Sequence, residues 1–164
     1  MSWGDAFLRQ ARGDDEIRRL LNRSDVAYSH RLHYLQMVTE KLAKGLQADT
    51  TAAEPPLPSH RAFVRLLQVL KGRPDVRRWL GFADRTSFRA SIDSLLGLAR
   101  HVENLAPSSA GFTHPNPEYP WRDPTDGTIH APVDFQFELF DPRDPRMIRL
   151  EMLVRGLLAF SVQQ

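Results

Sequence analysis

Residues 28–46 read YSHRLHYLQMVTEKLAKGL, and this stretch contains the pattern that decides the fold. Apolar or small side chains recur in it at steps of three and four residues, which is the spacing of one face of an α-helix. This stripe covers about five helical turns and consists of Tyr28, Leu32, Leu35, Thr39, Leu42, Ala43 and Leu46. We therefore predict a long helix, opened by the short polar side chain of Ser24 or Asp25, that packs against a helical core.

Similar spacing and helix-start residues predict further helices on both sides of this one. The expected helices begin at Asp14 or Asp15, at Ser59, at Pro74 and at Thr86 or Ser87, and they end near Leu21, Gly72, Leu80 and Val102. The apolar faces of the second and fourth consist of Phe63, Leu66, Leu67 and Leu70, and of Phe88, Ile92, Leu95, Leu96, Ala99 and Val102. Residues 48–58 contain three prolines and are predicted to be a linker loop.

The pattern changes after residue 106, since eight of the 12 prolines lie between Pro107 and Pro145. Such a stretch cannot be helical throughout. Asp126-Gly127 is typical of a tight turn, so we expect a small β-hairpin at about 119–140, with Pro132 on an edge. Its second arm would be the alternating residues Val133, Phe135, Phe137 and Leu139. A last helix, about 145–162, would turn inward Met147, Ile148, Leu150, Leu153, Leu157 and Leu158.

Together these elements predict a single domain over residues 1–164. Its fold class is mainly α: an antiparallel bundle of four to five helices with a Pro-rich insertion, about 107–145, that contains a small β-hairpin. The composition agrees, because 41% hydrophobic and 26% charged residues are typical of a soluble globular protein. No run approaches the 18 apolar residues that a membrane span needs, so no membrane partner is expected. The N-terminus lacks a signal-peptide pattern, so the expected location is the cytoplasm.

The cysteine content and the charge limit the kinds of site that the chain can form. The chain contains no cysteine, which excludes disulfides, thiolate catalysis, zinc ribbons and iron–sulfur clusters, and we predict no cofactor. Net charge is only +2, although 19 of the 22 basic residues are arginines. An excess this small does not by itself indicate a nucleic-acid-binding protein, whereas the guanidinium group is well suited to phosphate recognition.

Residues 33–47, HYLQMVTEKLAKGLQ, resemble the second helix of HEPN domains at Gln36, Glu40, Lys41, Leu42, Lys44 and Leu46. Two further stretches follow in the order of that superfamily. Residues 59–70 look like its third helix, which often opens with a histidine. Residues 98–123 are similar to the helix that ends in a Tyr-Pro segment, with Glu118-Tyr119-Pro120-Trp121 in place of the more usual Arg-Tyr-Pro-Asp. The resemblance spans roughly residues 14–123.

HEPN domains are small helical bundles that commonly dimerise and often serve in bacterial toxin–antitoxin and phage-defence systems. The resemblance therefore implies a homodimeric binding subunit of such a system, with a protein partner encoded nearby, or with RNA or a nucleotide as partner. The residues expected to contact phosphates are Gln36, Glu40, Lys41, Lys44, His60 and Arg61; the last two open a helix, whose free amides favour an anion. Tyr119 and Trp121 are the expected partner surface, unless they pack on the bundle as a lid.

Two alternatives remain open at this point. Some HEPN proteins are metal-independent endoribonucleases that carry an Arg, four to six residues, and then a His. Arg23 and His30 fit this spacing, and with His33 they could form a composite site at a dimer interface, although about two such pairs are expected by chance in this sequence. In the second alternative, His30, His33 and Glu40, one helical turn or more apart, hold a metal ion.

Overall fold

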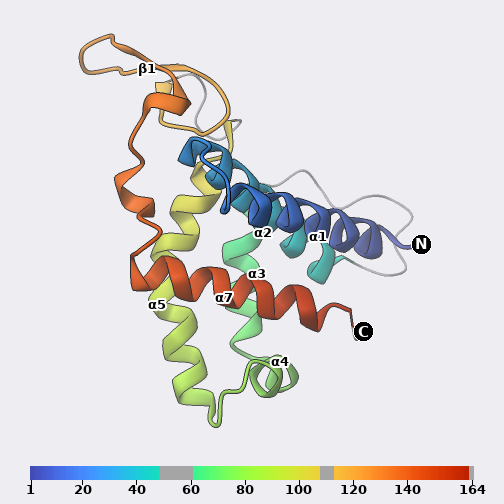
Figure 1. The fold of residues 1–164 in the computed structure, drawn as a ribbon. Coiled ribbons are helices and arrows are strands. Elements are labelled where there is room, and N and C mark those ends of the chain that lie inside the picture. Colours follow the sequence, from blue (N-terminus) through green and yellow to red (C-terminus); the bar gives the residue numbers. More distant parts are fainter. Residues whose placement is uncertain (49–60, 108–112, 163–164) are drawn as a thin grey trace.

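The protein is a bundle of helices with a small two-stranded sheet at one end (Figure 1). The computed structural model describes residues 1–48, 61–107 and 113–162. Within these ranges there are six α-helices: α1 Trp3–Leu21, α2 Tyr28–Gln47, α3 Ala62–Leu70, α4 Pro74–Trp79, α5 Arg85–Asn104 and α7 Pro145–Phe160. The predicted fold class, a mainly helical bundle with a small hairpin, is thus confirmed. None of the described helices is long and apolar enough to cross a membrane.

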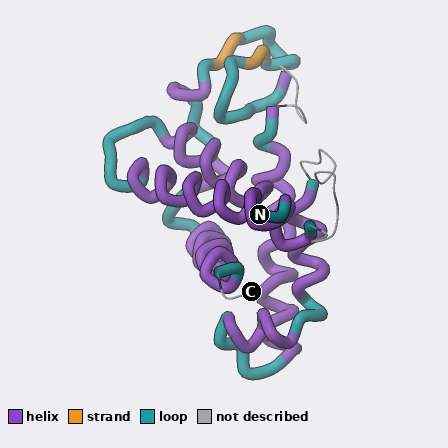
Figure 2. The backbone as a smooth tube through the Cα atoms, turned by 90° about the vertical axis from the view of Figure 1, so that its right-hand side faces the viewer, coloured by secondary structure: helices purple, strands orange, loops and turns teal. Residues whose placement is uncertain are grey.

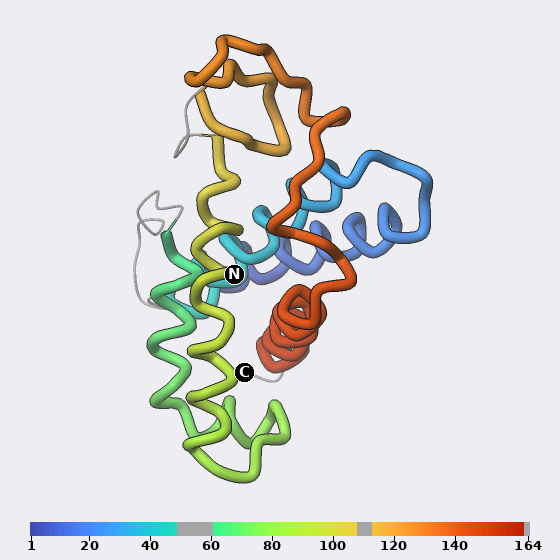
Figure 3. The backbone as a smooth tube through the Cα atoms, turned by 90° about the vertical axis from the view of Figure 1, so that its left-hand side faces the viewer, coloured from blue at the N-terminus to red at the C-terminus, as the bar shows by residue number. Residues whose placement is uncertain are grey.

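Helices α1 and α2 form an antiparallel pair (Figures 1 and 3). The predicted start of α1 at Asp14 or Asp15 is wrong. The helix begins after Ser2, whose hydroxyl accepts the N–H of Asp5 while the Asp5 carboxylate accepts the N–H of Ser2. This capping box supplies a start signal well before the apolar residues do. Asp14 and Asp15 lie inside the helix and are buried, because each binds a cationic side chain.

The predicted apolar face of α2 is confirmed, since Leu32, Leu35, Thr39, Leu42 and Ala43 are all buried. Its predicted start is wrong by a turn. The helix begins at Tyr28, and Ala27 at the cap position makes no side-chain hydrogen bond. Ser24 lies three residues before this cap position, and its hydroxyl donates to the Leu21 carbonyl oxygen at the end of α1.

Helices α3 and α5 run side by side in opposite directions, and α4 joins them at the lower end of the molecule in Figure 1. The predicted apolar faces of α3 and α5 are buried, apart from the half-buried Leu96. Pro74 begins α4 as expected, since its missing N–H is no loss in a first turn. The cap of α5 is Asp84 rather than Thr86 or Ser87, and its carboxylate accepts the Ser87 N–H at 2.8 Å. The predicted cap Ser59 and the linker after Ala48 lie outside the described residues.

The Pro-rich segment contains the predicted hairpin in a shorter form. β1 (Trp121–Arg122) pairs antiparallel with β2 (Ile129–His130), and Gly127 in the turn has φ +77°. The second arm expected from the alternation of residues 133–139 is wrong. Short 3-10 turns, η2 Pro132–Asp134 and η3 Glu138–Phe140, replace it, because Pro132 has no N–H to donate to a strand. The alternation still places Phe135 and Phe137 against the indole ring of Trp121.

Helix α7 lies across the other helices, so that Figures 2 and 3 view it nearly along its axis. It contacts α1, α2, α4 and α5 and thereby closes the core. Asp144 caps it, and the indole N–H of Trp79 in α4 donates to the Gly156 carbonyl oxygen at 2.9 Å. Of the residues predicted to face inward, Ile148 is 48% exposed. That prediction is wrong because the buried face of α7 includes Val154 and Phe160 instead, on the side opposite Ile148.

Candidate functional site

The side chains on α2 that were expected to contact phosphates bind one another. Gln36 Nε2 donates to Glu40 Oε2 at 2.8 Å, and Lys44 Nζ donates to Glu40 Oε1 at 2.5 Å. Lys41 Nζ donates to the buried carboxylate of Asp14 in α1 at 2.5 Å. Both lysine charges are therefore offset within the bundle and do not form a cationic groove. The Lys41–Asp14 pair connects α2 to α1, whereas the Glu40 contacts lie within α2.

The expected anion site at the start of α3 is occupied by the protein itself. His60 lies outside the described residues, and Arg61 makes no side-chain cap. Glu103 of α5 takes that role, since its carboxylate accepts the Val64 N–H at 2.8 Å. Burial raises the pKa of Glu103, although the hydrogen bonds from α3 oppose that shift. This carboxylate already accepts N–H groups of the first turn of α3, so the phosphate site predicted at His60 and Arg61 is not supported at Arg61.

The residues of the ribonuclease alternative are dispersed along α2 and the loop before it. Arg23 and His30 are exposed, and neither lines a cavity described below. His33 Nδ1 lies 3.7 Å from Glu118 Oε2, so this histidine links α2 to the Pro-rich segment. The metal alternative is not supported either, because Gln36 and Lys44 already bind the Glu40 carboxylate. The described parts of the chain contain no group of three His, Asp or Glu placed to hold a metal ion.

Of the two residues expected to form a partner surface, one is exposed and the other is buried. Tyr119 is 45% exposed. Trp121 is only 2% exposed, and its ring stacks on His130 and meets Phe135 edge-on at 4.8 Å between centroids. The prediction that Trp121 belongs to a partner surface is therefore wrong, since an aromatic ring of this size is stabilised by burial. The alternative, in which both residues pack on the bundle as a lid, is not shown by these contacts either, because the ring partners of Trp121 lie within the Pro-rich segment.

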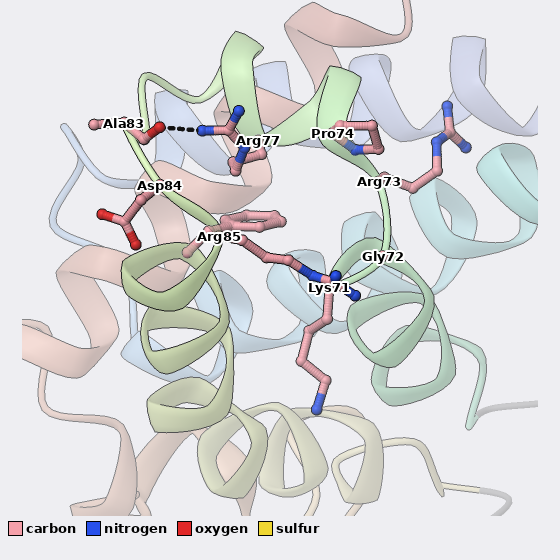
Figure 4. Close-up of a pocket in the computed structure, with 9 residues that line it drawn as sticks. Lys71, Gly72, Arg73, Pro74, Arg77, Ala83, Asp84 and Arg85 are labelled. Atoms are coloured by element: carbon pink, nitrogen blue, oxygen red, sulfur yellow. Dashed lines mark hydrogen bonds between the residues drawn. The ribbon is translucent and has the colours of Figure 1, made fainter.

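The strongest candidate site is a cationic cavity of about 340 Å³ at the lower end of the bundle (Figure 4). Two short connections create it by bringing the end of α3, both ends of α4 and the start of α5 together. Gly72 and Arg73 close the first connection before Pro74 begins α4, and Gly81, with φ +79°, ends α4. The cavity is lined by Lys71, Gly72, Arg73, Pro74, Arg77, Ala83, Asp84, Arg85 and Phe88.

Positive charge is concentrated around this cavity. Residues 71–89 contain two acidic side chains, Asp75 and Asp84, and six basic ones, so the segment carries +4 whereas the whole chain carries +2. The remaining residues of the chain are thus net acidic. The six basic side chains are Lys71, Arg73, Arg77, Arg78, Arg85 and Arg89. A local excess of this size attracts anions more strongly than the net charge of the protein suggests.

Two of the cations that line the cavity are neutralised by carboxylates. The Arg73 guanidinium binds Asp75 through two hydrogen bonds of 3.0 and 2.5 Å, and it lowers the pKa of that carboxyl to about 2. Lys71 Nζ lies 2.9 Å from Asp93 of α5. Both pairs are at least partly exposed, so they are open to competition from a strongly charged ligand.

The other two arginines that line the cavity, Arg77 and Arg85, form no salt bridge with a described carboxylate. Arg77 donates to the carbonyl oxygens of Phe82 and Ala83, which fixes its position without a carboxylate partner. Arg85 is exposed, and its guanidinium forms no hydrogen bond or salt bridge with any described residue. In Figure 4 its side chain reaches across the cavity toward Gly72 and Lys71. Asp84 forms no salt bridge with Arg85, and its carboxylate accepts hydrogen bonds from the Ser87 amide and hydroxyl, which lower its pKa.

Comparison of the chain with protein-family models, with curated proteins and with solved structures gives no match. The chemistry of the cavity therefore has to be argued from its own residues. Paired guanidinium groups around a concave surface are suited to phosphate oxygens, which they bind with directed hydrogen bonds as well as charge. Sequence reasoning placed the candidate phosphate contacts on α2 and at His60 and Arg61, and it did not single out Arg77 and Arg85, although the density of arginine in residues 71–89 was a visible signal.

Proposed function

We propose that this protein is a HEPN-like helical binding subunit of a bacterial defence or toxin–antitoxin-type system, and that it binds RNA through the cationic cavity between α3, α4 and α5. The observation that carries the proposal is Arg85, an exposed guanidinium without a described partner, directed into a cavity that Arg77 also lines. The resemblance of residues 33–47 to HEPN domains supports the choice of protein class. RNA is the partner in this proposal because its backbone offers a series of phosphates to a surface of this charge.

Backbone phosphates, rather than bases, are the groups that these residues suit. Phe88 is the aromatic side chain that lines the cavity, and it is buried in the core, so its face is not offered to a base. Arg78 and Arg89 are exposed and extend the positive charge beyond the cavity. Binding should consequently depend little on sequence and strongly on salt. For a single strand, the logarithm of affinity falls with the logarithm of salt by about 0.7 per phosphate contacted.

The experiment is a titration of a labelled, mixed-sequence single-stranded RNA with the protein, followed by fluorescence anisotropy at several salt concentrations. We expect Arg85→Gln to weaken binding and to reduce the salt slope by about 0.7, the value of one phosphate contact. Combining it with Arg89→Gln should reduce both further. Arg9→Gln is the matched control, because Arg9 is an exposed arginine on α1, a helix remote from α4 in Figure 1. Equal losses in the Arg9 and Arg85 variants would overturn the proposal.

A further inference from the structure

A second, separate cavity lies where the end of α1, the start of α2, the middle of α7 and the chain before α7 meet. Its volume is about 280 Å³. Most of its lining is polar, which distinguishes it from an ordinary packing defect between helices. The lining residues are Arg18, Asn22, Tyr28, Arg31, Leu32, Leu35, Pro142 and Glu151.

Arg18 forms the rigid inner wall of this cavity. It is 1% exposed, and its Nε and Nη2 donate to Asp15 Oδ1 at 3.1 and 2.9 Å. Its Nη1 lies 2.9 Å from Glu151 Oε1 on α7. One buried cation is therefore balanced by two carboxylates, and a fully buried charge persists only when it is paired in this way. These contacts fix Arg18 and Glu151 in place and offset the charge of Arg18, and the more exposed Arg19 and Arg155 contact the same two carboxylates.

Arg31 supplies a positive charge that, unlike the charge of Arg18, is not paired with a described carboxylate. Its Nη2 donates to the Ser24 carbonyl oxygen at 2.9 Å, whereas no described carboxylate forms a salt bridge with it. Its Nε is buried and has no hydrogen-bond partner. A buried donor without an acceptor is uncommon in folded proteins and costs stability. An oxyanion in the cavity would provide the missing acceptor after a small rotation of the Arg31 side chain.

Tyr28, which also lines the cavity, adds a hydroxyl as a neutral hydrogen-bond donor. Burial and the nearby Glu151 carboxylate raise the pKa of the Tyr28 phenol, so its hydroxyl keeps its proton at physiological pH. Leu32, Leu35 and Pro142 add apolar surface to the same lining. The lining of the cavity thus combines a guanidinium and a hydroxyl with hydrocarbon surface.

We propose that this cavity binds a small molecule with a single carboxylate, held by the Arg31 guanidinium and the Tyr28 hydroxyl, with its hydrocarbon part against Leu32, Leu35 and Pro142. The guanidinium group matches the planar geometry of a carboxylate. Glu151 lines the same cavity, so it repels a doubly charged phosphate more strongly than a singly charged carboxylate. This site is independent of the RNA contact proposed above, because the two cavities share no lining residue.

The test is a titration of the ¹⁵N-labelled full chain with propionate, followed by the NMR signals of the Arg31 Nε–H group and of the amides around Tyr28. A ligand of so few atoms is expected to bind with a millimolar Kd at best, so the titration extends to about 50 mM. We expect saturable shifts in the wild-type protein and at least tenfold weaker binding in Arg31→Gln. Tyr28→Phe preserves the ring and should weaken binding severalfold. Arg149→Gln, an exposed arginine on α7, is the matched control and should bind as the wild type does.

Three results would overturn the proposal: no saturable shift, an unchanged Kd in both Arg31→Gln and Tyr28→Phe, or tighter binding of inorganic phosphate than of propionate. The Tyr28→Phe variant keeps the test decisive if Arg31→Gln does not fold. N-acetylglycylglycine, titrated in parallel, presents the same carboxylate on a peptide. Tighter binding of propionate identifies a metabolite as the source of the carboxylate, and tighter binding of the dipeptide identifies the C-terminus of a protein.

Discussion

Gly4 of α1 and Gly45 of α2 face each other where the two helices come closest. A Cβ atom on Gly45 would lie 3.1 Å from the Gly4 carbonyl oxygen and 2.6 Å from Leu8 Cγ, and a Cβ on Gly4 would lie 3.2 Å from the Gly45 carbonyl oxygen. Such an approach of two backbones leaves no space for a side chain. It also fixes the register of the pair, which is the register that places Lys41 of α2 beside Asp14 of α1.

Gly45→Ala is therefore expected to destabilise the protein although alanine favours helices. Overpacking of a close contact typically costs about 1–3 kcal/mol in the free energy of unfolding. Gly97→Ala in α5 is the matched control, because Gly97 is exposed and a Cβ there would meet no atom within 4 Å. That variant should gain about 0.5–1 kcal/mol from helix propensity alone. Urea denaturation followed by circular dichroism measures both, and effects of the same sign would contradict the packing argument.

Replacement of Arg18 should cause the largest loss of stability among the charged side chains. Arg18→Met keeps much of the volume but leaves Asp15 and the partly buried Glu151 without their common cation. Breaking a buried ion pair on one side typically costs about 3–5 kcal/mol. The measurement is the midpoint and slope of a urea transition.

Arg19→Gln provides the comparison for Arg18, since Arg19 also contacts Asp15 but is largely exposed. Exposed ion pairs contribute little, so a change below about 1 kcal/mol is expected. A loss in Arg18→Met no larger than that in Arg19→Gln would show that the buried position of Arg18 is unimportant.

The helix faces could be predicted from the sequence, whereas several helix starts could not. Leu32, Leu35 and Leu42 lie at a helical spacing that no other element satisfies, and burial of one face follows directly. The starts depend on which of several short polar residues acts as a cap. Asp14 and Ser24 resemble caps in sequence, but the fold uses Asp14 as the partner of Lys41 and Ser24 as the end of α1. That choice depends on contacts between helices, which local spacing does not contain.

The candidate sites were harder to predict than the helix faces, for a different reason in each case. The second cavity is lined by both Arg31 and Glu151. These residues are far apart in sequence, and they line one cavity because α7 lies across α1 and α2. The cationic cavity is more local, and the arginine-rich residues 71–89 could have indicated it. The resemblance to HEPN domains directed attention to Lys41 and Lys44 instead, whose charges the fold offsets with acidic partners.

Glu103 should make stability depend on pH in a defined direction. Burial raises the pKa of this carboxyl above its ordinary value near 4.5. The folded state then binds the proton more tightly than the unfolded state, so this group favours folding at low pH, and that contribution is lost as pH rises through the folded-state pKa. Glu103→Gln keeps an oxygen that can accept the Val64 N–H and removes the titration. Relative to the wild type, the variant should therefore gain stability as pH increases from 4 to 7.

Urea denaturation at several pH values tests the Glu103 prediction. Glu138→Gln is the control, because Glu138 is exposed in η3 and its substitution should leave the pH profile parallel to that of the wild type. A profile for Glu103→Gln that also stays parallel to the wild type would show that the carboxyl titrates alike in both states.

RNA bound by the wild-type protein is expected to remain intact. Arg23, His30 and His33 line neither of the two cavities described above, and His33 lies close to Glu118, so neither cavity contains the general base and the cation of a ribonuclease site. Incubation with a labelled RNA and separation on a denaturing gel tests this, with His30→Ala as the second sample. Cleavage by the wild type that disappears in His30→Ala would instead support the composite dimer site. Cleavage that is equal in both would exclude the composite site, because His30 is the proton-transfer group which that site requires, and would contradict the expectation that the RNA stays intact.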